Sequence, residues 1–381
     1  MNFELTEDQI MIKESAMDFA ENEIAPSAVQ RDKDAEFPVD IVKKMGELGF
    51  MGMMVSPEYG GAGLDTISYV LAMIEISKVD ASVGVIMSVN NSLVCYGLEK
   101  YGSDHIKQKY LTPLAKGEKL GAFALSEPEA GSDATKQKTT ADKDGNYYLL
   151  NGIKNWITNG INADYTLVMA TTDKEKAHKG ISTFIVEKGT PGFGHGVKED
   201  KLGIRSSDTC SLTFENCRVP AENMVWDEGR GFNFAMNTLN GGRIGIAAQA
   251  IGIAEASLDA SVKYAKERKA FGQTISNFQA IQFKLSDMAV KIEGAKMLTF
   301  KAAALKDADK PYYKEAAMAK LYASKISVEC ALEVIQIHGG YGYVREYLVE
   351  RYLRDAKITE IYEGTSEIQK MVIARALLDP K

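Results

Sequence analysis

The chain has 381 residues, of which 45% are hydrophobic and 25% charged, and these ordinary globular proportions exclude disorder and low complexity as descriptions of the whole. Its 45 Lys and Arg against 52 Asp and Glu give a net charge of −7, so the overall charge does not indicate a nucleic-acid-binding surface. The length corresponds to roughly two or three domains.

The compartment is predicted from the first residues and the cysteines. The N-terminus has neither the basic nor the apolar stretch that directs export. The four cysteines are scattered without paired spacing, which is typical of buried thiols in a reducing compartment. We therefore expect a cytoplasmic protein without membrane insertion.

Helical patterns dominate up to residue 120. Thr6 and Gln9 have the spacing of a capping box, and residues 40–48 place their apolar side chains on one helix face. Residues 81–98 carry no charge but include Asn90 and Asn91, so we expect a buried helix rather than a membrane span. These patterns predict an N-terminal α-helical domain over residues 1–120.

Short runs rich in β-branched and aromatic residues replace the helical pattern in the middle of the chain. Turn signals separate them, and no helices alternate with them as a parallel sheet would require. We expect a small antiparallel β domain over residues 121–228. The runs are 147–150, 165–169, 182–186 and 211–214.

Helical periodicity returns in the last third. Ile281, Leu285, Met288 and Ile292 form one apolar stripe, and the Ala and Gly residues of 247–254 let helix backbones approach closely. We expect a C-terminal four-helix-bundle domain over residues 229–381, and hence an α+β multidomain fold.

Common site motifs are absent from the sequence. It contains no phosphate-binding loop, no dinucleotide fingerprint opening a βαβ unit, no HExxH and no GxSxG, and its four histidines lie far apart. We therefore expect no metal. By elimination, any chemistry relies on a bound organic cofactor or a single carboxylate.

Five segments in one order resemble the acyl-CoA dehydrogenase family of flavoproteins, over essentially the whole chain. Residues 240–254 are especially similar to its short-chain, butyryl-type branch. The five segments are FALSEPEAGSD (123–133), NWITNG (155–160), ERKAFGQ (267–273), QIHGGYG (336–342) and IYEGTSE (361–367).

The resemblance implies the activity: FAD-dependent α,β-dehydrogenation of a short-chain acyl-CoA to the trans-2-enoyl-CoA, with electrons passed to an electron-transferring flavoprotein. Removing a proton from Cα needs a carboxylate in a dry site, and Glu363 matches the family's base. Some family members carry the base immediately before the position of Arg243, where this chain has Gly242. Without the resemblance, Glu363 reads as one of several acids that complement a helix dipole.

The resemblance also implies the binding residues. Trp156 packs against the flavin ring, Thr158 bonds near its reactive nitrogen, and the residues at the adenine end reach a neighbouring subunit's cofactor, which implies a homotetramer. The implied FAD-binding residues are Phe123, Leu125, Ser126, Ser132, Trp156, Ile157, Thr158, Arg268, Phe271, Phe278, Gln279, Gln336, Gly339, Gly340, Thr365 and Glu367. The implied acyl-CoA-binding residues are Ser132, Asn240, Arg243, Tyr362 and Gly364.

Three alternatives stay open at this point. The acyl group could instead be branched or of the glutaryl type, because the sequence does not reveal the shape of the pocket. The physiological direction could be that of an enoyl-CoA reductase, which depends on the redox partner. A catalytically silent scaffold is the third alternative, although a scaffold has no need of a base such as Glu363.

Overall fold

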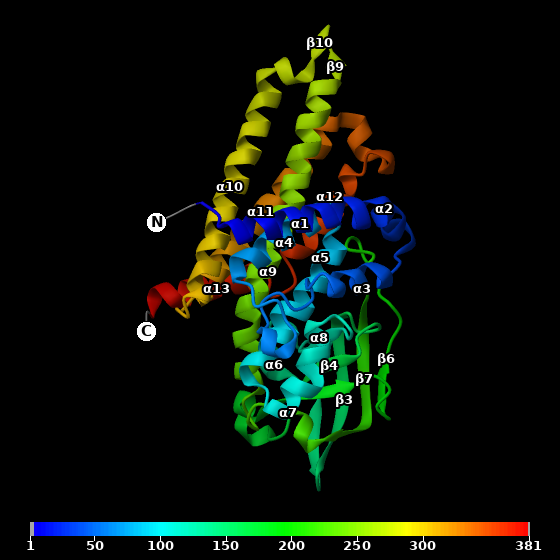
Figure 1. The fold of residues 1–381 in the computed structure, drawn as a ribbon, viewed down its shortest axis with the longest axis vertical. Helices are drawn as coiled ribbons and strands as arrows, with labels where there is room; N and C mark the ends of the chain where they lie inside the picture. The colour runs from blue at the N-terminus through cyan, green and yellow to red at the C-terminus, as the bar shows by residue number, and fades with distance from the viewer. Residues whose placement is uncertain (1–3, 380–381) are drawn as a thin grey trace.

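The described part of the computed structural model, residues 4–379, begins with a layer of helices (Figure 1). The Thr6 side chain accepts a hydrogen bond from the Gln9 N–H and the Gln9 side chain accepts one from the Thr6 N–H, so the predicted capping box is confirmed. The helices of this layer are α1 (Glu7–Phe19), a π-helical turn (Ala20–Ile24), α2 (Ala25–Asp34), α3 (Val39–Glu47), α4 (Thr66–Val79), α7 (Asp104–Ile106), a second π-helical turn (Lys107–Leu111) and α8 (Thr112–Ala115).

The charge-free stretch forms one helix that the rest of the protein encloses. It is long and apolar enough to cross a membrane, yet 94% of its apolar window is buried inside the protein. The Asn90 amide donates to the Met51 carbonyl at 2.8 Å, and the Asn91 amide donates to the Phe50 carbonyl at 2.8 Å. Both polar side chains are thus satisfied in the interior, and the predicted buried helix is confirmed. It consists of α5 (Ala81–Ser88), a π-helical segment (Val89–Cys95) and α6 (Tyr96–Tyr101).

Eight strands form one sheet in the order β6-β7-β3-β2-β4-β5-β8, with β1 beside β4. Most pairs are antiparallel, but β1 runs parallel to β4, and Thr140 pairs with Thr171 in the same sense. The sheet is therefore mixed, because β1 enters from the helical layer and lies along β4 without a hairpin turn. The strands are β1 (Gly121–Ala124), β2 (Thr140–Asp144), β3 (Tyr147–Thr158), β4 (Tyr165–Thr171), β5 (Ile181–Glu187), β6 (Phe193–His195), β7 (Thr209–Pro220) and β8 (Met224–Val225).

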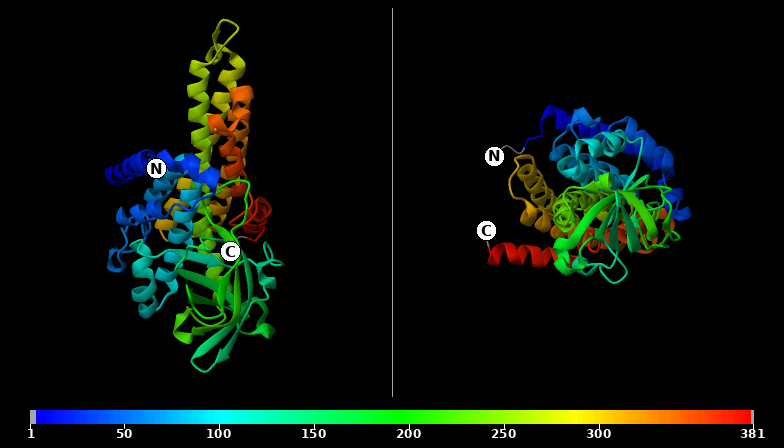
Figure 2. Two further views of the ribbon diagram at one scale, coloured as in Figure 1. Left: turned by 90° about the vertical axis from the view of Figure 1, so that its right-hand side faces the viewer. Right: turned by 90° about the horizontal axis from the view of Figure 1, so that it is seen from below.

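Three long helices follow the sheet and project away from it (Figures 1 and 2). The first, α9, has 37 residues. A two-stranded hairpin joins it to α10 at the tip of the projection, and two shorter helices pack against α11. The elements are α9 (Gly231–Glu267), β9 (Lys269–Ala270), β10 (Gln273–Thr274), α10 (Gln279–Asp307), α11 (Tyr313–His338), α12 (Val349–Thr359) and α13 (Ser366–Leu378).

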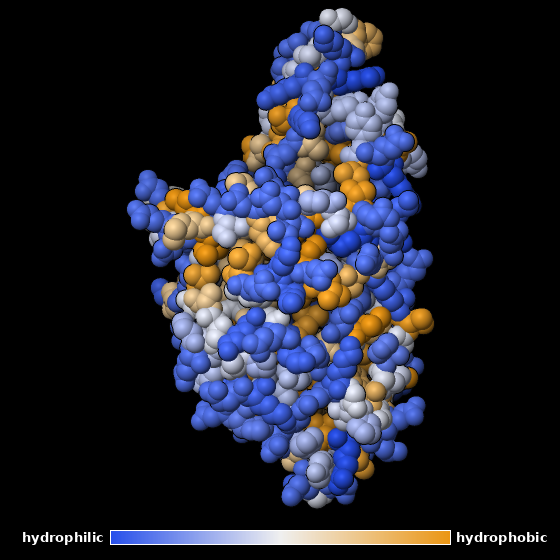
Figure 3. All heavy atoms as spheres, turned by 45° about the vertical axis from the view of Figure 1, so that its right-hand side comes forward, coloured by the Kyte–Doolittle hydropathy of each residue, from blue (hydrophilic) through white to orange (hydrophobic). Residues whose placement is uncertain are grey.

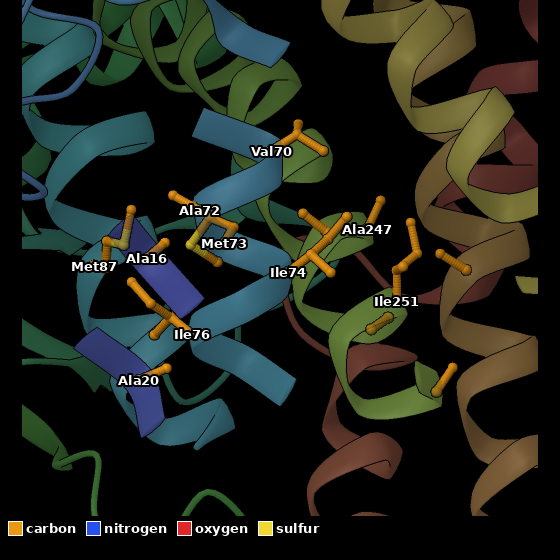
Figure 4. Close-up of a cluster of buried hydrophobic side chains, with 14 of the residues drawn as sticks. Ala16, Ala20, Val70, Ala72, Met73, Ile74, Ile76, Met87, Ala247 and Ile251 are labelled. Carbon is orange, nitrogen blue, oxygen red and sulfur yellow. The ribbon is translucent and has the colours of Figure 1, made fainter. Parts of the chain in front are cut away.

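The largest apolar core joins the N-terminal helices to α9. Ile74 of α4 lies beside Ile251 of α9 in this cluster (Figure 4). The backbones are close: a Cβ at Gly252 would lie 2.5 Å from the Ile74 carbonyl oxygen. The small residues of 247–254 therefore permit the close helix contact that the sequence predicted. This contact fixes the middle of α9, the helix that carries one wall of the candidate site.

Candidate active site

Glu363 lies in the tight connection between α12 and α13. Its backbone has a φ of 54°, and Gly364 follows with a φ of 88°. A left-handed glutamate costs about 1–3 kcal/mol and persists only where its surroundings enforce it. Here the Gln369 side-chain amide donates to the Gly364 carbonyl at 2.8 Å and to the Glu363 carbonyl at 3.2 Å. The turn therefore aims the Glu363 side chain at a defined place.

The start of α13 differs in detail from what residues 366–369 suggest. A capping box with Ser366 and Gln369 is the pattern in the sequence, but Thr365 is the N-cap and accepts a hydrogen bond from the Ile368 N–H at 3.3 Å. The Gln369 side chain bonds the turn instead of the cap. The helix therefore begins one residue earlier than that pattern suggests, directly after the left-handed turn at Glu363 and Gly364.

Glu363 is a half-buried residue whose carboxylate has one buried, unpaired oxygen. Within residues 4–379, its Oε2 atom has no hydrogen-bond partner. Burial raises the pKa of Glu363 to about 7, although the positive charges of Arg243 and Lys320 oppose the rise. A carboxylate whose pKa lies near neutrality suits a general base.

Gly242 of α9 lies directly against this carboxylate. A Cβ at position 242 would overlap Glu363 Oε2 and would lie 2.9 Å from Leu93 Cδ2. The absence of a side chain at 242 thus makes room for the acid. Positions 242 and 363 face the same point, which explains in physical terms how a base could be supplied from either of them.

Four of the five residues expected to contact substrate lie around this point, namely Asn240, Arg243, Tyr362 and Gly364, whereas Ser132 lies in an exposed loop. Arg243 is buried, and its Nη1 donates to Asn240 Oδ1 at 2.7 Å. Burial lowers the pKa of Arg243, while the negative charge of Glu363 opposes that change. The Tyr362 hydroxyl donates to Gln249 Oε1, which anchors the residue before the candidate base.

Two segments expected to bind the flavin are tied together. The Asn155 N–H donates to the Ser126 carbonyl at 2.9 Å, and Lys154 Nζ donates to the Leu125 carbonyl at 3.0 Å. Leu125 belongs to the same apolar cluster as Leu93, which touches the Glu363 site. The two segments, around Leu125 and Asn155, and the candidate base Glu363 therefore border the same apolar cluster.

Trp156 is an exposed aromatic residue on β3. Its side chain is 61% exposed, its φ is 62°, and it lies where the register between β3 and β7 shifts. A tryptophan of the hydrophobic core would be buried, so the exposed Trp156 ring does not serve as a core residue within this chain and is accessible to a ligand. Next to it, Ile157 is buried and Thr158 ends the strand. Two further expected flavin-binding residues lie near these segments in the sequence: Phe123 on β1, which stacks on Phe234, and Ser132 in the exposed loop after β1.

A second group of expected FAD-binding residues lies far from the first. Arg268 is 26 positions after Gly242 along α9, which corresponds to about 39 Å of helix. A cleft of about 540 Å³ lies there, lined by Arg268, Gly339 and Gly340 among others. Phe271, 95% exposed with a φ of 52°, caps the hairpin beside it and contacts Phe278. Gln279 begins α10, and Gln336 lies in the last turn of α11.

Thr365 and Glu367 remain with the first group, at the start of α13. The expected FAD-binding residues thus form two groups within one chain. The first offers an exposed indole and strand-end polar groups, which fit a flavin ring. The second offers a cation and glycine backbone amides, which fit a pyrophosphate.

Two buried lysines were not among the residues selected from the sequence. Lys154 is fully buried and bonds Glu127 at 2.8 Å, and Lys320 is fully buried behind Glu363. The sequence pattern could have indicated that Lys320 is buried, because it lies on the helix face that carries Ala316 and Ala323, where a charged residue is unusual. The burial of Lys154 could not be predicted in this way, because the register shifts in β3 interrupt the alternation of inward-facing and outward-facing residues.

Matches to protein-family models now define the class. The models of the acyl-CoA dehydrogenase N-terminal, middle and C-terminal domains match residues 6–118, 122–217 and 229–378. The chain belongs to the acyl-CoA dehydrogenase family.

Within residues 4–379, no group of three His, Cys, Asp or Glu side chains could hold a metal ion.

Individual relatives are similar over nearly the whole chain. The mitochondrial short-chain specific acyl-CoA dehydrogenase of Rattus norvegicus is 55% identical over 98% of this chain and 91% of its own length. The butyryl-CoA dehydrogenase structure from Megasphaera elsdenii is 48% identical over 99% of this chain and all of its own, with a TM-score of 0.98. A chain in a structure described as the electron transferring flavoprotein of Acidaminococcus fermentans is 53% identical over the full length of both, with a TM-score of 0.99.

The Lys154 side chain is expected to hold the segment around Leu125 in place. Lys154→Met leaves the Glu127 carboxylate buried without its partner, and such a loss costs about 3–5 kcal/mol. We expect a clear drop in thermal melting temperature and weaker cofactor retention. The matched control is Lys138→Met, because Lys138 pairs with Glu129 in the solvent. Equal melting temperatures for the two variants would contradict this role.

Proposed function

We propose that the protein catalyses the FAD-dependent α,β-dehydrogenation of a short-chain acyl-CoA to the trans-2-enoyl-CoA, with an electron-transferring flavoprotein as electron acceptor. The observation that carries the proposal is the Glu363 carboxylate: buried, with one unpaired oxygen, and with a pKa raised to about 7. A scaffold has no need of such a group. The short-chain substrate is supported by the rat and Megasphaera relatives, and the electron acceptor by the description of the Acidaminococcus structure.

In the proposed reaction, Glu363 takes the proton from Cα of the thioester. The surrounding apolar side chains, such as Leu93, exclude water, which keeps the carboxylate basic enough to accept that proton. Arg243 supplies a nearby positive charge that favours the ionised carboxylate before the transfer. FAD, when bound, supplies the acceptor for the hydride that leaves Cβ. The first group of binding residues would hold its ring and the second its adenine end.

The separation of the two groups supports a shared cofactor site. Arg268 lies about 39 Å along α9 from Gly242, which faces the candidate base, and this separation supports assigning the second group to the cofactor of another copy. An exposed apolar stripe on α10 offers a contact surface: Phe283, Val290 and Met297 recur every seven residues at 63%, 73% and 43% exposure. Apolar patches also gather near the base of the projecting helices (Figure 3). These features support a homotetramer.

Two further expectations stay as proposals. The four cysteines are free and buried, which supports a reducing compartment such as the cytoplasm. The division into domains at 1–120, 121–228 and 229–381 is supported by two changes of structure: α8 ends at Ala115 before β1 begins at Gly121, and β8 ends at Val225 before α9 begins at Gly231.

Replacing Glu363 by Gln tests the base. The amide keeps the volume of the acid but cannot accept the proton, so we expect substrate-driven flavin bleaching to slow by roughly 10²–10⁴-fold while FAD stays bound. Stopped-flow absorbance with butyryl-CoA measures this rate. Glu293→Gln, which changes an exposed glutamate on α10, is the control. Bleaching within about tenfold of wild type would assign the base to another residue.

Comparing substrates of four, eight and sixteen carbons tests the acyl preference. Burying one additional methylene contributes about 0.8 kcal/mol only if the pocket has apolar space for it. A pocket that fits four carbons therefore discriminates against longer chains. We expect kcat/KM to be highest for butyryl-CoA. Glutaryl-CoA and a branched four-carbon thioester belong in the same series. A maximum at eight carbons or above, or with either of those two, would refute the short-chain assignment.

Replacing Arg268 by Ala tests the shared site. Loss of a cationic contact to a phosphate costs about 1.5–3 kcal/mol, so we expect FAD to bind roughly ten- to a hundredfold more weakly. Size-exclusion chromatography at a flavin wavelength measures both retention and assembly. Lys266→Ala, two residues before Arg268 at the same exposed helix end, is the control. If wild type elutes as a monomer with full flavin, the shared site is wrong.

A further inference from the structure

Lys320 is a buried cation without a direct ion pair. Its side chain is fully buried on α11, and within residues 4–379 no carboxylate lies within 4 Å of its ammonium. The other fully buried lysine, Lys154, bonds Glu127 at 2.8 Å. An unpaired ammonium in the interior is costly, so its position calls for a physical reason.

The ammonium instead holds the peptide that follows the candidate base. Lys320 Nζ donates to the Gly364 carbonyl oxygen at 2.8 Å. The Gln369 side-chain amide donates to the same oxygen at 2.8 Å. Two donors from two helices therefore fix one carbonyl in the left-handed turn. One of the two donors carries a charge and the other does not.

Titratable groups from three other elements face this turn, two of them charged and one neutral. Arg243 on α9 and Lys320 on α11 act on Glu363 as positive charges, and the buried Tyr69 on α4 faces it as a neutral hydroxyl whose pKa burial raises to about 12. Tyr362, beside the base, is likewise held neutral by burial, which raises its pKa. The charges that act on Lys320 are Glu363, Arg243, Glu360 and Glu367.

Burial lowers the pKa of Lys320 to about 7, and the charge of Glu363 opposes that fall. Burial raises the pKa of Glu363 to about 7, and the charge of Lys320 opposes that rise. Each group therefore makes the charged form of the other more favourable. Gln369 can hold the Gly364 carbonyl but cannot contribute in this way.

We propose that Lys320 is a positioning residue for the dehydrogenation reaction: its ammonium fixes the Gly364 carbonyl and is the counter-charge that keeps the Glu363 carboxylate ionised before it takes up the Cα proton. This inference rests on the proposed function. It makes Lys320 part of the electrostatics of proton removal, although it does not touch the reacting atoms.

The test separates the charge of Lys320 from its hydrogen bond. Lys320→Gln keeps an amide donor but removes the charge, whereas Gln369→Leu removes hydrogen bonds to the same carbonyl and leaves every charge in place. The readout is the pH dependence of flavin bleaching by butyryl-CoA in the holoenzyme. We expect the acid-side midpoint to rise by about one pH unit in Lys320→Gln. In Gln369→Leu the rate falls without a shift of the midpoint.

An unshifted midpoint in Lys320→Gln, or an equal shift in Gln369→Leu, overturns the proposal. If Lys320→Gln does not retain FAD, a thermal melting cycle at pH 7, near the pKa of both groups, with Lys320→Met, Glu363→Gln and the double variant decides instead. Removing the buried acid is expected to restore much of the stability that Lys320→Met loses, whereas additive losses overturn the counter-charge. The cycle needs no substrate. If butyryl-CoA fails to bleach the wild type, the proposed function fails while the cycle still tests Lys320.

Discussion

Burial of one carboxylate oxygen, that of Glu363, constrains three parts of the chain at once. It uses the space left by the glycine at 242, because the acid would have to shift if a Cβ stood there. It requires two successive left-handed residues at 363 and 364, which only a firmly held turn sustains. It also brings Arg243 and Lys320 into the same interior, where each is costly alone. These local costs are offset by the extensive apolar core between α4 and α9.

The regular parts of the fold could be predicted from local patterns, because each depends on nearby residues. The capping box at Thr6 and the buried helix from Ala81 are examples. The parallel pairing of β1 with β4 could not be predicted, because the sequence of a four-residue strand does not determine which strand it pairs with. The N-cap of α13 was predicted one residue late, at Ser366 instead of Thr365, because the strained turn before it leaves no periodic signal.

The candidate site was predictable only in part. Residue types alone favoured Glu363 as a helix-dipole acid, and the resemblance to a family was what assigned it as the base. Burial then supplies the chemical reason, by raising its pKa. Lys320 and Lys154 are visible only in three dimensions, because each acts through a backbone carbonyl distant in sequence.

The long helix α9 connects catalysis to assembly. Its middle presents Gly242 to the candidate base, and its end presents Arg268 to a cleft about 39 Å away. A single rigid element thus serves two cofactor sites in the proposed oligomer. In this arrangement, loss of the cofactor weakens the subunit contacts, and loss of the subunit contacts weakens cofactor binding. The two are linked because each form of binding stabilises the other.

The central claim is that burial makes Glu363 a base that ionises near neutral pH. The most direct measurement is the pH dependence of the single-turnover rate of flavin bleaching by butyryl-CoA in the wild-type holoenzyme. Because the base acts when deprotonated, the account predicts a rate that rises with pH with a midpoint near 7, the value to which burial raises the Glu363 pKa. A midpoint near 4.5, the ordinary value for a glutamate, would contradict it.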